Sequence, residues 1–154
     1  MSTLLEILTC ILGTIGFSVL LKVSKKKIIF TVIGGTISSV IYYLMTNCGK
    51  STFISTLWAM IAICVYSEVL ARIIKTPANV ILIPSTIPLL PGGNLYYTLS
   101  YIINFDREQF RHYLNETVSA GFGIALGAVI ISIIITFING AVTQIKKTKA
   151  KQKH

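Results

Sequence analysis

The chain has 154 residues, of which 53% are hydrophobic and only 12% are charged, and its mean hydropathy is +0.75. A soluble domain carries about 25% charged residues, so this composition excludes an ordinary soluble domain. The charges gather in short patches at 22–27, 72–75, 106–116 and 146–154, and apolar stretches separate the patches.

Each apolar stretch is long enough for a membrane-spanning helix, which needs roughly 20 mostly apolar residues. In chain order the stretches lie at about 4–21, 28–45, 53–74, 80–103 and 118–138. We therefore predict an all-α integral membrane protein with about five transmembrane helices. A single transmembrane domain is expected over residues 1–145, followed by a basic cytoplasmic tail at 146–154. The first stretch follows no Lys or Arg, so it does not read as a cleaved signal peptide.

The distribution of Lys and Arg predicts how the spans are oriented, because these residues concentrate in cytoplasmic loops. With five spans and the N-terminus outside, 11 of the 14 basic residues lie on the cytoplasmic side. If the stretch 80–103 did not cross, the division would be eight to six. The sequence thus predicts a multi-pass protein of the cell (inner) membrane with a cytoplasmic C-terminus. Basic residues that lie against anionic lipid explain the net charge of +9, so this charge does not call for a nucleic-acid partner.

Two spans contain small residues four positions apart. These are Gly34 with Ser38, Gly35 with Ser39, and Gly123 with Gly127. Such pairs let another helix approach closely. They indicate helix packing, either within this chain or against another chain.

The third stretch carries two charges near its cytoplasmic end. Glu68 and Arg72 are four residues apart, so they share one helix face and can pair. Ionisable groups at membrane depth are costly and mark ion pathways or internal pairs. Two interpretations stay open here, a static ion pair and a proton carrier.

The stretch 80–103 is interrupted by Pro84, Pro88, Pro91, Gly92 and Gly93. Proline removes a backbone donor and disturbs the preceding turn, and freed backbone groups in a membrane must lie against protein or a watery cavity. We expect a broken helix near the midplane that binds substrate. The predicted substrate-binding residues are Pro88, Pro91, Gly92, Gly93, Asn94 and Tyr96. A kinked structural helix or a re-entrant hairpin is the other interpretation.

The sequence gives no sign of an enzyme, a metal site or a cofactor. Cys10, Cys48 and Cys64 form no close-spaced pair, and His112 and His154 are far apart. No Ser/His/Asp set or pair of carboxylates falls within the spans, and no Gly-rich nucleotide loop is present.

One segment resembles a known family. Residues 67–97 read SEVLARIIKTPANVILIPSTIPLLPGGNLYY. This resembles the small subunit of the two-component threonine/serine exporter family, and equally the C-terminal half of its single-chain members. The matching positions are Ser67, Glu68, Ala71, Arg72, Lys75, Pro77, Ile87, Pro88, Leu89, Pro91, Gly92 and Tyr96. Ser85 stands where the family pattern has glycine, and Tyr97 where it has a basic residue.

The resemblance implies a subunit of a secondary exporter of small polar metabolites, either threonine and serine or a dicarboxylate such as succinate. It also implies a larger partner subunit similar to the N-terminal half of the fused members. An ion gradient, most simply of protons, would drive export, with Glu68 as the candidate carrier. The alternatives are a small membrane scaffold, assembly or holin-like protein without a substrate pathway, and a small multidrug antiporter. The latter would place a carboxylate in the middle of its first span, and Glu6 is too near the terminus.

Overall fold

The computed structural model describes residues 3–151, and among them the side chains of residue 5 and residues 7–140. The described residues form helices joined by short turns. The elements are α1 (Thr3–Leu20), α2 (Lys25–Asn47), α3 (Thr52–Ile73), α4 (Asn79–Thr86), the 3-10 turn η1 (Ile87–Leu89), α5 (Gly92–Ile103) and α6 (Arg107–Lys151). The predicted all-α membrane fold is confirmed.

Three of these helices are long and apolar enough to cross a membrane, by length and composition: Lys25–Asn47, Thr52–Ile73 and Arg107–Gly140 within α6. The apolar helices Ile7–Leu20 and Asn79–Leu89 are shorter. Large apolar side chains such as Leu12, Ile29 and Phe137 are exposed on the outside. Several hydroxyl side chains are buried inside: Thr14, Ser18, Thr31, Ser38, Ser55, Thr56, Ser67, Ser85 and Thr98. This distribution suits a lipid solvent, where small polar residues hold helices together.

The charged patch at 106–116, which lies between the predicted spans 80–103 and 118–138, is mostly helix. After a tight turn, α6 begins at Arg107 and continues without interruption to Lys151. The Asp106 carboxylate accepts a 3.2 Å hydrogen bond from the Gln109 backbone N–H, which satisfies one of the free donors at the helix start. This cap, together with packing against α5, extends the helix well before the apolar run begins.

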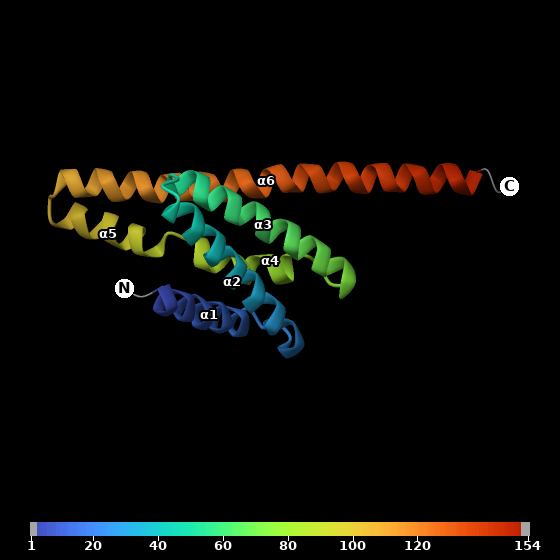
Figure 1. The fold of residues 1–154 in the computed structure, drawn as a ribbon, viewed down its shortest axis with the longest axis horizontal. Coiled ribbons are helices and arrows are strands. Elements are labelled where there is room, and N and C mark those ends of the chain that lie inside the picture. The colour runs from blue at the N-terminus through green and yellow to red at the C-terminus, as the bar shows by residue number, and fades with distance from the viewer. Residues whose placement is uncertain (1–2, 152–154) are drawn as a thin grey trace.

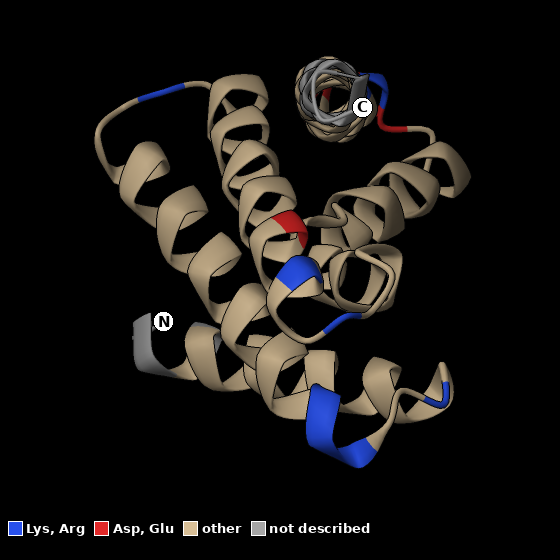
Figure 2. Ribbon diagram, turned by 90° about the vertical axis from the view of Figure 1, so that its right-hand side faces the viewer, with Lys and Arg blue, Asp and Glu red and all other residues tan. Residues whose placement is uncertain are grey.

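The helices form an elongated bundle with the long α6 along one side (Figure 1). The α1–α2 turn, the α3–α4 turn and the C-terminal part of α6 lie toward one end, here called the basic end. Figure 2 views the molecule from this end and shows Lys and Arg at both turns. The α2–α3 and α5–α6 turns lie toward the opposite end, where α5 and the start of α6 project beyond the other helices (Figure 1).

Four glycines allow the closest helix contacts. A Cβ on Gly34 would stand 2.5 Å from the Ser85 Oγ of α4, and a Cβ on Gly35 would stand 2.5 Å from the Thr14 Oγ1 of α1. On α6, Gly123 contacts Thr56 of α3, and a Cβ on Gly127 would stand 2.9 Å from the Met60 Cβ. In the described part of the chain, these glycines therefore lie against other helices of the same chain.

The two serines of α2 differ in environment. Ser38 is buried, and its hydroxyl bonds to the Gly35 carbonyl at 2.7 Å. Ser39 bonds to the same carbonyl at 2.9 Å but faces a pocket instead of another helix. An apolar cluster on α3 fills the centre beside them: Ala59, Met60, Ile63 and Cys64 with Leu89 and Ile131.

Candidate functional site

The predicted interruption of the helix is present, but it occupies only part of the expected stretch. Pro84 lies inside α4, which ends at Thr86. The backbone then tightens into η1, becomes extended at Leu90 (φ −64°, ψ 127°) and re-enters helix at Gly92. The break therefore falls at residues 87–91, because Pro88 and Pro91 remove two backbone donors three residues apart, whereas α4 tolerates Pro84 near its end.

The break leaves two backbone donors at the start of α5. The Gly92 N–H bonds to the Leu90 carbonyl at 2.8 Å and the Leu95 N–H bonds to the Pro91 carbonyl at 2.9 Å. Among the described residues, the N–H groups of Gly93 and Asn94 have no such main-chain partner. The first donors of a helix normally lack intrahelical partners and carry partial positive charge.

A cavity of about 190 Å³ lies against this break. The break itself lines one side, from Pro88 to Asn94, including the predicted residues Pro88, Pro91, Gly92, Gly93 and Asn94. Residues of three other helices line the rest: Tyr42 of α2, Thr52 and Thr56 of α3, and Ala120 of α6. The cavity thus combines free backbone donors with hydroxyl groups.

Glu116 of α6 is not itself in the lining of this cavity, but it contacts a lining residue, Thr52. Its Oε2 accepts a hydrogen bond from the Thr52 hydroxyl, and Glu116 lies one helical turn before Ala120. Tyr42 interacts with Thr46 and Thr52, and with Glu116 electrostatically. Glu116 is half-buried, and within the described part of the chain no Lys, Arg or His forms an ion pair with it.

The sequence predicts a site near the midplane of the membrane, but the cavity lies closer to one end of the bundle. Its residues Tyr42, Thr52 and Ala120 stand at or near the ends of the predicted spans 28–45, 53–74 and 118–138. The reason is the course of the chain after the break. Instead of running beside α2 and α3, α5 projects past them and packs along the first turns of α6 (Figure 1).

Tyr96 is not in the cavity lining, contrary to its expected role. Its side chain is 68% exposed and makes an edge contact with Tyr97. Tyr97, Tyr101 and Tyr113 form a stacked group, with the Tyr97 and Tyr113 ring centroids 5.1 Å apart. This group holds α5 against α6, and tyrosines of this kind are typical of the edge of a membrane.

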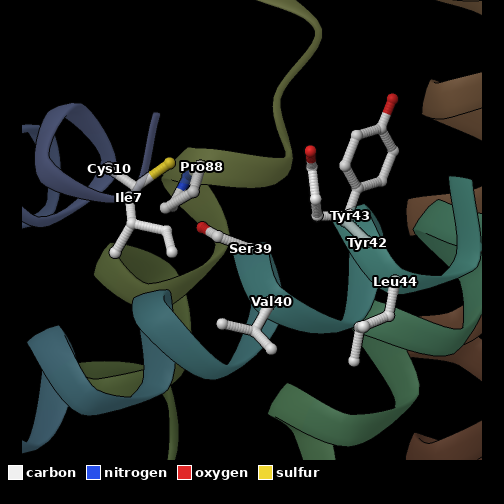
Figure 3. A pocket seen from close by; sticks show the side chains of 8 residues that line it. All are labelled: Ile7, Cys10, Ser39, Val40, Tyr42, Tyr43, Leu44 and Pro88. Atoms are coloured by element: carbon white, nitrogen blue, oxygen red, sulfur yellow. The ribbon is translucent and has the colours of Figure 1, made fainter. Parts of the chain in front are cut away.

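A second, larger pocket of about 460 Å³ lies on the other side of Tyr42 and Pro88, which line both hollows. In Figure 3, Ile7 and Cys10 of α1 and Pro88 stand on one side of it, and Tyr42, Tyr43 and Leu44 of α2 on the other. Its walls are mostly apolar, so this pocket suits a lipid chain or an apolar side chain better than a charged metabolite.

Glu68 and Arg72 lie toward the basic end, away from the cavity. Arg72 Nη2 donates to Glu68 Oε1 at 3.1 Å and to Asn139 Oδ1 of α6 at 2.8 Å. The Arg72 side chain is 53% exposed and that of Glu68 is 24% exposed. Arg72 therefore joins α3 to α6 through Asn139, and both side chains of the ion pair are partly exposed.

Sequence reasoning found the break but missed the residues opposite it. Tyr42, Thr52, Thr56 and Glu116 carry no motif of their own. One signal was available, since Thr52 and Glu116 both stand next to apolar stretches at ends that the predicted topology places on the same side.

Together the features define a helical membrane protein with an interrupted helix beside a polar cavity, an arrangement that transport proteins use. A family model described as "Threonine/Serine exporter, ThrE" matches residues 6–134. The chain belongs to the threonine/serine exporter family, which confirms the resemblance seen in residues 67–97 and gives the protein a transport role in a membrane. Comparisons with curated proteins and with solved structures gave no significant match.

Proposed function

We propose that this chain is one subunit of a secondary exporter of small polar metabolites, and that the cavity beside residues 87–94 is its substrate site. The observation that carries the proposal is that Gly93 and Asn94, whose N–H groups have no main-chain partner among the described residues, line a cavity together with Thr52 and Thr56. Such donors at a helix start favour a carboxylate group. Threonine, serine and small dicarboxylates all supply one.

A larger partner subunit would complete this site. A Cβ placed on Gly92 or Gly93 would find no heavy atom within 4 Å, and both residues are exposed. At Gly92 and Gly93 the cavity wall therefore has no side chain, which leaves room for another chain. A partner similar to the N-terminal half of the fused exporters would close the cavity against water and lipid.

The proposed orientation has five crossings, with α4, η1 and α5 together forming the fourth. The turns at the basic end would be cytoplasmic, in agreement with the preference of Lys and Arg for that side. The cavity would then lie toward the outer side of the membrane. The 8 residues of α4, at about 1.5 Å per residue, and the 3 of η1, at about 2.0 Å per residue, extend only about 18 Å, so α5 is needed to complete the crossing.

An ion gradient, most simply of protons, would drive export. Glu68 is the proposed proton carrier at the cytoplasmic side, because protonation would remove the charge that orients Arg72, the residue that joins α3 to α6 through Asn139. Glu68 lies outside the cavity lining, so it would act on helix packing and not by touching substrate.

Export by the native host tests the proposal. A strain lacking this chain, and the same strain with the gene restored, would be loaded with threonine-, serine- or succinate-yielding precursors, and the medium would be sampled. Restored export of at least one of these compounds is expected. Equal export by both strains for all three compounds would reject the transporter-subunit function and favour the scaffold alternative.

A further inference from the structure

We infer that Glu116 binds the ammonium group of an amino-acid substrate, and that the exporter therefore selects amino acids over dicarboxylates. This inference rests on the proposed function and assigns a substrate class to the same cavity. It starts from a carboxylate that packing places beside the cavity and that lacks a cationic partner among the described residues.

The position of Glu116 is fixed by two contacts. The Glu116 carboxylate accepts a hydrogen bond from the Thr52 hydroxyl of α3. Glu116 also lies one turn before Ala120, in a part of α6 that packs closely on α3 because Gly123 contacts Thr56. Thr52 and Ala120 both line the cavity. The close packing of α3 and α6 therefore places the Glu116 carboxylate directly beside a residue of the cavity lining.

The charge of Glu116 is only partly compensated. A hydroxyl donor stabilises a carboxylate less than a cation does, and a half-buried carboxylate near the membrane is costly without a counter-charge. Basic side chains are close in sequence, since Arg111 and His112 are on the same helix. These side chains are exposed and, with Arg107 and Glu108, line a separate shallow pocket. A substrate ammonium group would supply the missing cation.

The two ends of the site have opposite electrical character. The free N–H groups of Gly93 and Asn94 favour a carboxylate, and Glu116 favours a cation. A zwitterionic amino acid matches both ends. A dicarboxylate would bring its second negative charge toward Glu116 and would be repelled. The Thr52 and Thr56 hydroxyls provide partners for the side-chain hydroxyl of serine or threonine.

Serine and glycerate test the assignment, because glycerate has a hydroxyl group at the position where serine has its ammonium group. Inside-out vesicles would be prepared from host cells that make the complete transporter with the wild-type chain, Glu116→Gln, Glu116→Asp or Glu108→Gln. Glu108 is the matched control, since it is an exposed acid two turns earlier on the same helix. Uptake of labelled serine, labelled glycerate and labelled succinate would each be measured alone and in competition with the other two. The amount of chain in the membrane would be measured in parallel.

Wild type and Glu108→Gln are expected to prefer serine over glycerate. Glu116→Gln is expected to lose that preference by roughly 10-fold or more, the effect of one hydrogen bond to a charged group, and Glu116→Asp is expected to restore part of it. An equal loss for serine and glycerate, or an unchanged preference, overturns the ammonium assignment while leaving the transport function intact. Preference of the wild-type chain for succinate overturns it as well. Absence of transport for all three compounds rejects the proposed function itself.

Discussion

The Ser85 hydroxyl of α4 donates a 3.0 Å hydrogen bond to the main-chain carbonyl of Thr31 on α2, and Gly34 on α2 leaves the space that the Ser85 side chain occupies. This contact fixes the segment just before the break. Thr31 is also tied to α1, since its hydroxyl lies 2.8 Å from that of Ser18. One serine thus connects α4 to a pair of helices that are already bonded to each other.

Replacing this serine should weaken the bundle. Ser85→Ala removes the donor to Thr31 and is expected to lower the free energy of unfolding by about 1 kcal/mol, the usual net value of such a bond. Ser132→Ala, at an exposed serine of α6, is the control and should change stability by less than about 0.5 kcal/mol. Unfolding in mild detergent measures both. Equal effects of the two substitutions would show that the Ser85 bond contributes nothing specific.

The α3–α6 contact should tolerate no side chain at Gly123. Gly123→Leu would meet Thr56 and the Phe53 carbonyl, so helix separation is expected, with a loss of at least about 1–3 kcal/mol. Gly121→Leu is two residues away, where a Cβ meets nothing within 4 Å, and it should leave the fold intact. Thermal stability in detergent compares the two variants. A stable Gly123→Leu protein would contradict the packing described here.

Glu68→Gln should lower export without unfolding the chain. Arg72 keeps its bond to Asn139 when the Glu68 charge is lost, and an exposed ion pair contributes at most about 1 kcal/mol. Export would be measured over a range of pH, with the amount of folded protein determined alongside. Wild-type export at every pH would remove Glu68 from the coupling mechanism.

Gly92→Leu should abolish export and leave both the fold and the partner association in place. The added side chain has free space in this chain but would enter the open wall of the cavity. Gly140→Leu, also in open space but at the other end of the bundle, should export normally. Normal export by Gly92→Leu would count against the site at residues 87–94.

The orientation of the chain can be tested with thiol reagents. Cys48 is exposed at the end of α2, whereas Cys64 is buried. A membrane-impermeant reagent should therefore label Cys48 in intact cells from the outside. A cysteine introduced by Ala150→Cys should react only after the membrane is opened. Labelling at 150 from outside would refute the proposed five-span orientation.

Local chemistry explains which features could be predicted from the sequence. The lengths of α2 and α3 follow from apolar runs between charged patches, and the break follows from Pro88, Pro91 and Gly92, whose effects act on their own backbone. The helix over Arg107–Thr117 was missed because its stability comes from the Asp106 cap and from packing against α5. Neither contact gives an apolar pattern.

By itself, the sequence determined the class of the protein, its family and the place where the helix breaks, because hydropathy and proline geometry depend only on nearby residues. The tertiary structure alone decided what lies opposite the break. Thr52 and Glu116 are 64 positions apart, and they meet where Gly123 and Gly127 allow α6 to pack closely on α3. The glycine pair predicts that some helix approaches α6 closely, but which helix approaches, and which side chains meet there, depends on the packing of helices that are distant in the sequence.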